Sequence, residues 1–320
     1  MSLKIKCLYR EDFKKVFNFL ENNFSSPTHY KEWNMVVSKH FKTEFFYFGA
    51  FDGNELIGVC PLHRYKINSR MRVVSGPKEF LIPYGGWIFS KGETVKKTYF
   101  PIRKNESLEI FSLPLLNEFN TNYKGLKLLK NYETSIIDLE KNEDDIWNGL
   151  DQKRRNMIRK AIKNNVEIST LQNEDLKEFY YFYSSANDSY GLESMPFGYF
   201  RDLNNMAENI NLDIITAKSE KKILGLNVII SNKDFSIYWL GVRKKETENN
   251  GFFDLLQWES IKKSKGRKCK YYDLCYVEKE RLPNIYKFKT DYSNNFIPVY
   301  NLSKRSTFYK ILNRVRKITG

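Results

Sequence analysis

Two stretches of this 320-residue chain share one pattern and lie about half a chain length apart. Residues 45–65 and 212–231 each read as two apolar strands around a polar turn, DGN in the first and SEK in the second, which predicts a β-hairpin. The second strand of each pair carries a glycine after two aliphatic residues, Gly58 and Gly225, which are 167 positions apart. A duplicated unit explains this pattern, and so does chance recurrence of a common hairpin.

The segments between and after these hairpins alternate between strand and helix patterns. We expect strands over 132–139, 235–242 and 270–276, and helices over 146–165, 174–187, 197–208 and 252–265, the last ended by Gly266. This order predicts an α/β (α+β) fold with mixed sheets flanked by helices. A charged break at 141–145 and the length predict domains at 1–145 and 146–302, followed by a tail at 303–320.

Composition excludes several classes of protein. The four cysteines and three histidines form no zinc-spaced cluster, so we expect free thiols, no metal site and no Ser-His-Asp triad. Lysines begin before any apolar stretch and no apolar run could span a bilayer, so we expect no signal peptide, no transmembrane segment and a cytoplasmic protein. The net charge of +15 favours an anionic partner, although a lysine-rich background composition explains it equally well.

Seven short motifs occur in one order along the chain. They are PL and PYGG at 61–62 and 83–86, KRRNMIRKA at 153–161, YWLG at 238–241, LLQWESI at 255–261, YDL at 272–274 and YKFKTDY at 286–292, with Trp33 before them. In this order the motifs resemble those of the Fem-like aminoacyltransferases (FemA, FemB and FemX) and of related GNAT proteins. The resemblance covers almost the whole chain.

The resemblance implies two GNAT-like domains in tandem, which would account for the repeated hairpin. It implies transfer of an acyl or aminoacyl group to a primary amine of a peptidoglycan or exopolysaccharide precursor. The implied donor is aminoacyl-tRNA or acyl-CoA, with no tightly bound cofactor, and the partners are tRNA, CoA or a nucleotide-linked precursor. Two alternatives remain: an acyl-CoA-dependent enzyme acting on a soluble amino or nucleotide sugar, and a non-catalytic module that binds tRNA or nucleotide.

Two residues are candidates for catalysis. Lys289 lies in the element where the resemblance places a lysine that stabilises developing negative charge, although an exposed lysine without function is the simpler alternative. Tyr238 lies in a predicted strand, where its phenol would be a hydrogen-bond donor or proton relay, or else a buried tyrosine bonded to backbone.

Candidate binding residues occur in both halves. Tyr84, Gly85 and Gly86 predict either close approach of backbone to a ligand or a tight turn. The other substrate-binding candidates form a cationic helix face and are Lys153, Arg155 and Arg159. This face either binds phosphate groups or is simply exposed to solvent.

The sequence departs from the families that it resembles at the segment after the 235–242 strand. Acetyl-CoA enzymes place a glycine-rich loop there, which binds pyrophosphate, but residues 243–251 read RKKETENNG with one glycine. This weakens the CoA interpretation, although Arg243 remains a candidate for phosphate binding. Residues 87–89, WIF, stand where the Fem enzymes carry an aspartate, so a different acceptor is expected.

The tail shows apolar residues at helical spacing with lysines and arginines around them. Residues 303–320 therefore predict a basic amphipathic helix. Two interpretations stay open: residues 304–320 dock peripherally on the inner membrane face, or the helix packs on the protein's own core.

Overall fold

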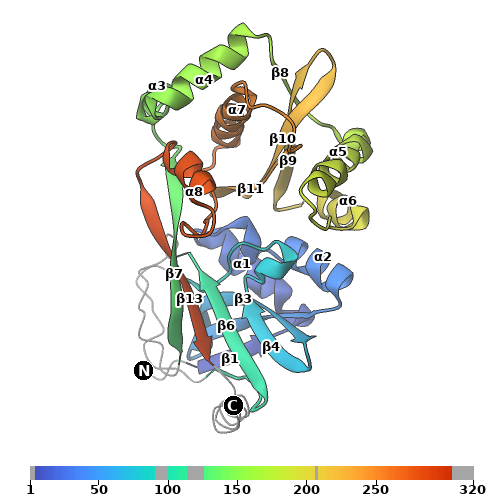
Figure 1. Cartoon of the computed structure of the whole chain (residues 1–320). Coiled ribbons are helices and arrows are strands. Elements are labelled where there is room, and N and C mark those ends of the chain that lie inside the picture. The colour runs from blue at the N-terminus through green and yellow to red at the C-terminus, as the bar shows by residue number, and fades with distance from the viewer. Residues whose placement is uncertain (1–3, 91–99, 114–125, 206–207, 305–320) are drawn as a thin grey trace. The chain divides into compact units, whose positions relative to one another are not determined.

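The computed structural model describes residues 4–90, 100–113, 126–205 and 208–304 (Figure 1). The chain divides into two units, unit 1 with residues 1–133 and 297–320, and unit 2 with residues 134–296. These limits differ from the expected boundaries after residues 145 and 302. The difference arises because the chain enters unit 2 within one strand, β7 (Lys127–Asp138), and leaves it at the start of another, β13 (Phe296–Lys304).

Unit 1 is built on a sheet in the order β1-β2-β3-β4-β6-β13, with β5 paired to β3. Its strands before β13 are β1 (Lys4–Leu8), β2 (Glu44–Asp52), β3 (Glu55–Ile67), β4 (Arg70–Ser75), β5 (Ile88–Phe89) and β6 (Glu106–Ser112). Its helices are η1 (Arg10–Asp12), α1 (Phe13–Asn22), η2 (Pro27–His29), α2 (Lys31–Phe41) and η3 (Lys78–Phe80). Neighbouring strands are antiparallel except β4 and β6, which are parallel.

Different elements cover the two faces of the unit 1 sheet. Helices α1 and α2 pack against β2 and β3 on one face. On the other face Phe48 lies against the rings of Trp87 and Phe100, with centroids 6.4 and 6.1 Å away. Trp87 in turn stacks on Phe89 of β5, at 5.2 Å. The WIF segment at 87–89 is therefore core, because its aromatic side chains supply the burial that a helix would otherwise give.

Unit 2 has the sheet order β7-β12-β11-β10-β9-β8. The strands besides β7 are β8 (Glu167–Thr170), β9 (Asn211–Ser219), β10 (Lys222–Ser231), β11 (Phe235–Arg243) and β12 (Tyr271–Asp273). The helices are α3 (Glu143–Gly149), α4 (Gln152–Lys163), η5 (Asn173–Asp175), α5 (Leu176–Ser189), α6 (Phe197–Asn205), α7 (Phe252–Gly266) and α8 (Pro283–Thr290). Again one neighbouring pair, β11 and β12, is parallel, and the other pairs are antiparallel.

Helices cover both faces of the unit 2 sheet (Figure 1). Helix α7 packs on β9 and β10 and against α4. The rings of Tyr199 and Phe200 on α6 pack on Trp239, which follows Tyr238 on β11 and belongs to the opposite face. This three-layer arrangement confirms the predicted α/β class.

The repeated hairpins occupy the same place in both sheets, as β2–β3 in unit 1 and β9–β10 in unit 2. Their registers are also the same. Ala50 pairs with Gly58 in the first and Ala217 with Gly225 in the second, and each hairpin has an irregularity directly beside this pair. Since a one-residue slip would move every side chain to the other face, this agreement supports a duplicated unit.

Three details differ from the expectations. The single helix predicted over 146–165 is two helices, because Asp151 begins α4 by accepting a hydrogen bond from the Lys153 amide with its side chain. The strand predicted over 270–276 ends at Asp273, since Cys275 has a left-handed backbone with φ 60°. Gly266 is the last residue of α7 and not its cap.

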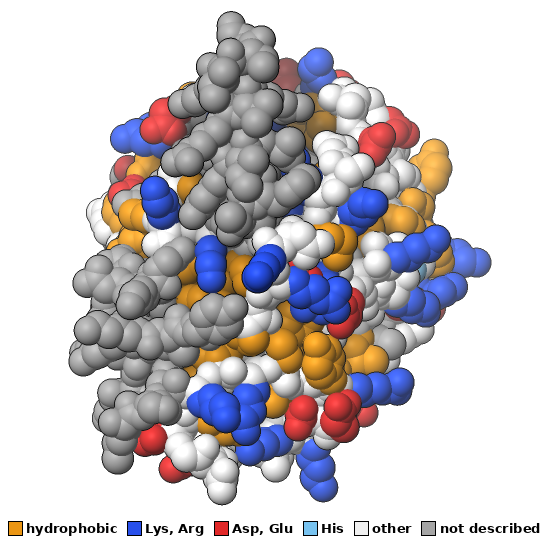
Figure 2. All heavy atoms as spheres, turned by 90° about the horizontal axis from the view of Figure 1, so that it is seen from below, with side chains coloured by type: hydrophobic (Ala, Val, Ile, Leu, Met, Phe, Trp, Pro, Cys, Tyr) orange, Lys and Arg blue, Asp and Glu red, His pale blue; other side chains and the backbone are white. Residues whose placement is uncertain are grey.

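Other expectations concern the tail, the thiols, the membrane and the surface charge. Strand β13 continues to Lys304, and residues 305–320 lie outside the described residues, so the predicted tail helix stays a prediction. All four cysteines are free. Within the described ranges, no helix has the length and apolar character needed to cross a bilayer. On the face in Figure 2, the described lysines and arginines are spaced among apolar and acidic side chains without gathering in one patch.

Candidate active site

The two parallel strands of unit 2 separate where the candidate catalytic residues lie. Strand β12 pairs with β11 over Phe235–Ile237 and then ends, while β11 continues to Arg243. Tyr238 is the first residue of β11 beyond this pairing, and the register against β10 shifts beside it. The separation leaves one edge of β11 without its β12 partner, beside the Tyr238 side chain.

Lys289 on α8 lies next to Tyr238, so the structure brings the two predicted catalytic residues together. The ammonium Nζ of Lys289 lies 5.6 Å from the centre of the Tyr238 ring, a cation–π distance. It also donates a hydrogen bond to the Cys275 carbonyl oxygen at 2.9 Å. Lys289 is thus partly buried and oriented, unlike an ordinary surface lysine.

Asp273 of the YDL motif holds the backbone that receives Lys289. The Asp273 side chain accepts hydrogen bonds from the Thr134 hydroxyl at 2.5 Å and from the Cys275 amide at 2.9 Å. These bonds fix the left-handed turn at Cys275, whose carbonyl oxygen therefore points to Lys289. The position of Lys289 is therefore set by a chain of hydrogen bonds that begins on β7.

The hydroxyl group of Tyr238 makes no hydrogen bond with any described residue, although the side chain is only 6% exposed. A second buried tyrosine shows the contrast, since the Tyr272 hydroxyl accepts a bond from Gln257 Nε2 at 2.8 Å. Space for the Tyr238 hydroxyl comes from Gly241, where a Cβ atom would overlap it. The oxygen of this hydroxyl is not among the fully buried atoms of the described residues, so it can bond to water or to a ligand.

Burial shifts the proton affinity of both groups. Desolvation, and then the nearby Cys275 thiol, raise the pKa of Tyr238 well above its ordinary value, so the phenol stays protonated and can donate. Desolvation lowers the pKa of Lys289 below its ordinary 10.5, while the nearby Cys275 and Asp273 act in the opposite direction. The site therefore offers two hydrogen-bond donors of different proton affinity.

The other predicted residues lie elsewhere. On α3 and α4, Arg155 bonds to the Asn148 carbonyl oxygen and to Gln152, Arg159 bonds to Asn156, and Lys153 is exposed. No contact among the described residues joins these three cations to Tyr238 or Lys289. Arg243 donates to the Thr247 carbonyl oxygen at 2.6 Å and so holds the loop after β11. Their role in binding stays a prediction.

Tyr84, Gly85 and Gly86 lie in unit 1 and are buried. The Gly86 amide donates to Ser75 Oγ at 2.8 Å, and the Gly85 amide donates to the Phe111 carbonyl oxygen at 2.8 Å. A Cβ on Gly85 would overlap Ser75. The groups that closely approach these glycines are therefore residues of the chain itself.

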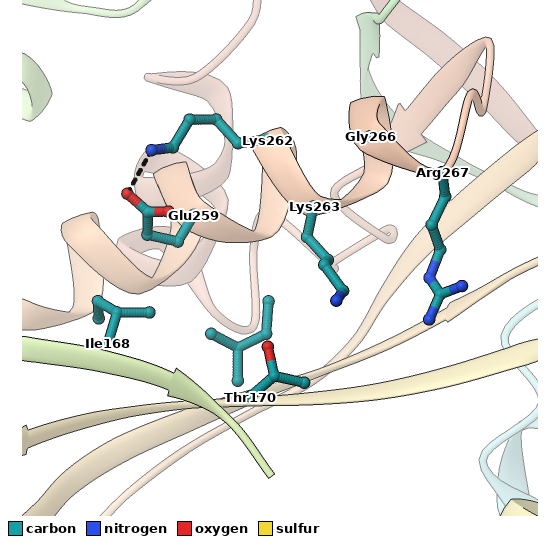
Figure 3. A pocket seen from close by; sticks show the side chains of 8 residues that line it. Ile168, Thr170, Glu259, Lys262, Lys263, Gly266 and Arg267 are labelled. Atoms are coloured by element: carbon teal, nitrogen blue, oxygen red, sulfur yellow. Dashed lines mark ion pairs between the residues drawn. The ribbon is translucent and has the colours of Figure 1, made fainter. Parts of the chain in front are cut away.

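A hollow of about 500 Å³ lies beside the C-terminal half of α7 and is lined by residues of α7, β8 and β9 and by Arg267 (Figure 3). Its charged groups are paired: Lys262 bonds to Glu259 at 2.7 Å, and Arg267 forms two bonds to Asp213. Because an α-helix rises about 1.5 Å per residue, the α7 residues that line this hollow lie roughly 10 to 20 Å along the helix from its first residue. It is a separate surface feature.

Sequence reasoning missed Arg154, which lies between two predicted binding residues. Arg154 is 8% exposed, and its guanidinium group binds two carboxylates, Asp254 and Asp291, each at 2.9 Å. The sequence contained a pattern that could have identified it. Arg154 precedes the buried Ile158 by one helical turn and so belongs to the buried stripe of α4.

Comparisons with known proteins agree with this architecture. Residues 115–227 match the FemAB family model. This segment runs from before β7 into β10, and it does not include Tyr238 or Lys289. No curated protein matches the sequence. The predicted resemblance to the Fem-like transferases is confirmed.

Solved structures of low sequence identity share the fold over nearly the whole chain. A FemX crystal structure is 12% identical with a TM-score of 0.63, covering 92% of this chain and 96% of FemX. The C-terminal domain of a putative lysylphosphatidylglycerol synthetase from Agrobacterium fabrum is 9% identical, with a TM-score of 0.58 and 96% of each chain covered. A tandem GNAT protein from the clavulanic acid biosynthesis pathway is 11% identical, with a TM-score of 0.53, covering 94% of this chain and 98% of that one. The chain has the tandem GNAT fold.

Proposed function

We propose that the chain transfers an aminoacyl or acyl group to a primary amine of a cell-envelope precursor, at the site formed by Tyr238 and Lys289. The observation that carries this proposal is the hydroxyl group of the 6% exposed Tyr238, which bonds to no described residue and lies on the side chain next to the oriented ammonium group of Lys289. The match of residues 115–227 to the FemAB family supports the class of reaction. The peptidoglycan or exopolysaccharide acceptor is proposed from this match and from the resemblance of motifs.

The two donors suit the charges that develop in acyl transfer. The acceptor amine attacks the carbonyl carbon, a C–N bond forms, and the bond from that carbon to the leaving oxygen breaks. Lys289 donates a hydrogen bond where negative charge develops on the carbonyl oxygen, an interaction that is strongest in a site shielded from water. Tyr238, protonated because its pKa is raised, passes a proton to the leaving oxygen and regains one from the nitrogen of the acceptor amine, which becomes positively charged when the C–N bond forms.

The first turn of α7 supports an ester donor such as aminoacyl-tRNA over acyl-CoA. In GNAT enzymes that use CoA, free amide groups at this turn bind pyrophosphate. Here the side-chain oxygen of Asn249 accepts from the amides of Gly251 and Phe253, at 3.2 and 3.3 Å. A Cβ on Gly251 would overlap the Met157 carbonyl oxygen, so α4 closes this approach.

A second candidate function is transfer from acyl-CoA to a soluble amino or nucleotide sugar. The observation that favours it is a run of three cations where phosphates of CoA would lie: Arg243 at the end of β11, followed by Lys244 and Lys245. Under this alternative the Asn249 side chain must leave the amides when the donor binds.

The two candidates are separated by turnover with each donor. The protein is given charged tRNA, acetyl-CoA or longer acyl-CoA, together with peptidoglycan precursors and amino sugars, and amide formation is followed by mass spectrometry. We expect product with an aminoacyl-tRNA and none with acyl-CoA. Product with acyl-CoA alone would favour the second candidate, and no product with any donor would favour a non-catalytic binding module.

A further inference from the structure

Helix α8 carries Lys289 but buries none of its own residues. Its apolar packing comes from the partly buried Phe288, whose ring lies 5.8 Å from that of Phe253 and 5.2 Å from that of Tyr292, and polar contacts add to it. Polar and cation–π contacts to this segment come from Arg154 on α4, which belongs to the same unit.

Arg154 contacts one residue on each side of Lys289, Phe288 in α8 and Asp291 directly after it. Its Nη2 and Nε atoms donate to Asp291 Oδ2 at 2.9 and 3.2 Å. Its guanidinium group also lies over the Phe288 ring, 5.1 Å from the centre. Phe288 and Asp291 bracket Lys289 in the sequence, so both contacts act on the backbone that carries the ammonium group.

The same guanidinium group reaches a second helix. Its Nη1 atom donates to Asp254 Oδ1 at 2.9 Å, in the first turn of α7, and the Tyr292 hydroxyl donates to the same oxygen at 3.0 Å. Asp254 is fully buried, so its charge depends on these partners. Arg154 therefore ties α4, α7 and the end of α8 into one network.

We propose that Arg154 is a positioning residue that holds Lys289 against Tyr238. Arg154 touches neither of these residues, and it acts through Asp291 and Phe288. A planar fork of N–H groups is needed to serve two carboxylates at once, which a lysine ammonium cannot reproduce in the same geometry. Any effect on turnover rests on the proposed function, whereas the effect on Lys289 itself does not.

The test measures Lys289 directly in the full chain. Wild type, Arg154→Met, Arg154→Lys and the control Lys160→Met, an exposed residue of the same helix, are labelled with acetic anhydride over a range of pH. Mass spectrometry then gives the rate at each lysine. In wild type and control we expect slow labelling of Lys289 and a pKa below the ordinary value. In Arg154→Met we expect labelling several-fold faster and a pKa that moves up toward that of exposed lysines, with Arg154→Lys in between.

A second variant keeps the test decisive if the first variant does not fold. If Arg154→Met does not fold, as judged by circular dichroism, Asp291→Asn is used, because it keeps the bond between Arg154 and Asp254. It should shift Lys289 in the same direction by a smaller amount. Wild-type labelling of Lys289 in a folded Arg154→Met or Asp291→Asn variant would overturn the proposal. Loss of fold in Arg154→Lys as well would show that Arg154 stabilises the core only.

This readout needs no substrate, so it stands apart from the test of function. Absence of turnover with every donor would refute the proposed function and leave the labelling result unaffected. Where turnover is found, a positioning role predicts a lower kcat with a nearly unchanged KM for Arg154→Lys.

Discussion

Units 1 and 2 share the order of six strands, apart from β5, and the register of the repeated hairpin, but they differ in how the parallel strands are connected. In unit 2 the connection from β11 to β12 is the helix α7. In unit 1 the connection from β4 to β6 contains η3, the turn at residues 83–86 and β5 in its described part. The same sheet thus supports two different crossovers.

The connection between the two parallel strands determines which residues lie at the point where these strands separate. In unit 1 the turn fills that place, since Gly85 forms a parallel bridge with Ser112 and Gly86 bonds to Ser75. In unit 2 the corresponding place holds Lys289 and Tyr238, whose hydroxyl group bonds to no residue that the structure describes. We infer that unit 1 is a packed structural copy and that unit 2 carries the transfer site.

The largest expected difference between the units is their response to acid. Burial lowers the pKa of His29 to about 4 and of His63 to about 3, and all three histidines of the chain lie in unit 1. The unfolded chain takes up protons below the ordinary histidine pKa of 6.5, but these folded side chains do not. Stability is therefore present above pH 6.5 and is lost as the pH falls toward 4, by up to about 1.4 kcal/mol per pH unit for each histidine.

Hydrogen exchange followed by mass spectrometry at pH 7 and pH 5 resolves the two units. Unit 1 should lose protection on acidification while unit 2 keeps it. His63→Gln should reduce the change in hydrogen-exchange protection of unit 1 between pH 7 and pH 5. The control His40→Gln, at a partly exposed residue, should leave this change as it is in wild type. Equal loss in both units would contradict the assignment.

The second prediction concerns the ammonium group of unit 2. Lys289→Met should lower turnover by about 10²–10³, the usual cost of losing one donor to a developing oxyanion. The exposed Lys279→Met serves as the matched control and should stay near wild type. Steady-state kinetics measures both, and near-wild-type turnover of Lys289→Met would remove its catalytic role.

The third prediction compares one glycine from each unit. A Cβ on Gly85 would overlap Ser75 and lie 2.7 Å from the Gly76 amide nitrogen, so Gly85→Ala should destabilise the protein by about 1–3 kcal/mol. A Cβ on Gly241 would meet side chains, those of Tyr238 and Phe253, which can move. Gly241→Ala should therefore reduce turnover more than stability. Thermal unfolding and kinetics on both variants decide this, and the reverse pattern would place the ligand at Gly85.

The smallest effect on stability is expected for Tyr238→Phe. Because the lost hydroxyl has no partner among the described residues, unfolding free energy should change by less than about 0.5 kcal/mol, while turnover falls by about 10². Tyr272→Phe should do the opposite, since its hydroxyl bonds to Gln257 in the core. Equal effects of the two variants on both quantities would show that Tyr238 is ordinary core.

Local patterns predicted much of this fold, and long-range pairing set the rest. The hairpins and most helices follow from turn residues and apolar periodicity, which neighbouring residues determine. The unit limits could not be predicted, because β7 completes the sheet of unit 2 and β13 that of unit 1 through pairings far apart in the sequence. No local pattern specifies such partners.

The site shows the same division. Tyr238 and Lys289 were predicted from motifs, but their contact depends on the turn at Cys275 that Asp273 holds. Arg154 was missed because its partners lie 100 and 137 residues further along the chain. Gly85 and Gly86 were identified as positions of close approach, and only the structure shows that Ser75 and Ser112 are what they approach.

The claim that unit 2 alone carries the transfer site is tested most directly by mapping where a donor binds. Hydrogen exchange with mass spectrometry is recorded on the full chain with and without an amide-linked, non-hydrolysable aminoacyl-tRNA. We predict protection at residues 235–243, 271–277 and 283–292 of unit 2, and unchanged exchange at residues 76–89 and 106–112 of unit 1. Protection that falls on the turn at residues 83–86, with residues 235–243 unchanged, would contradict the account.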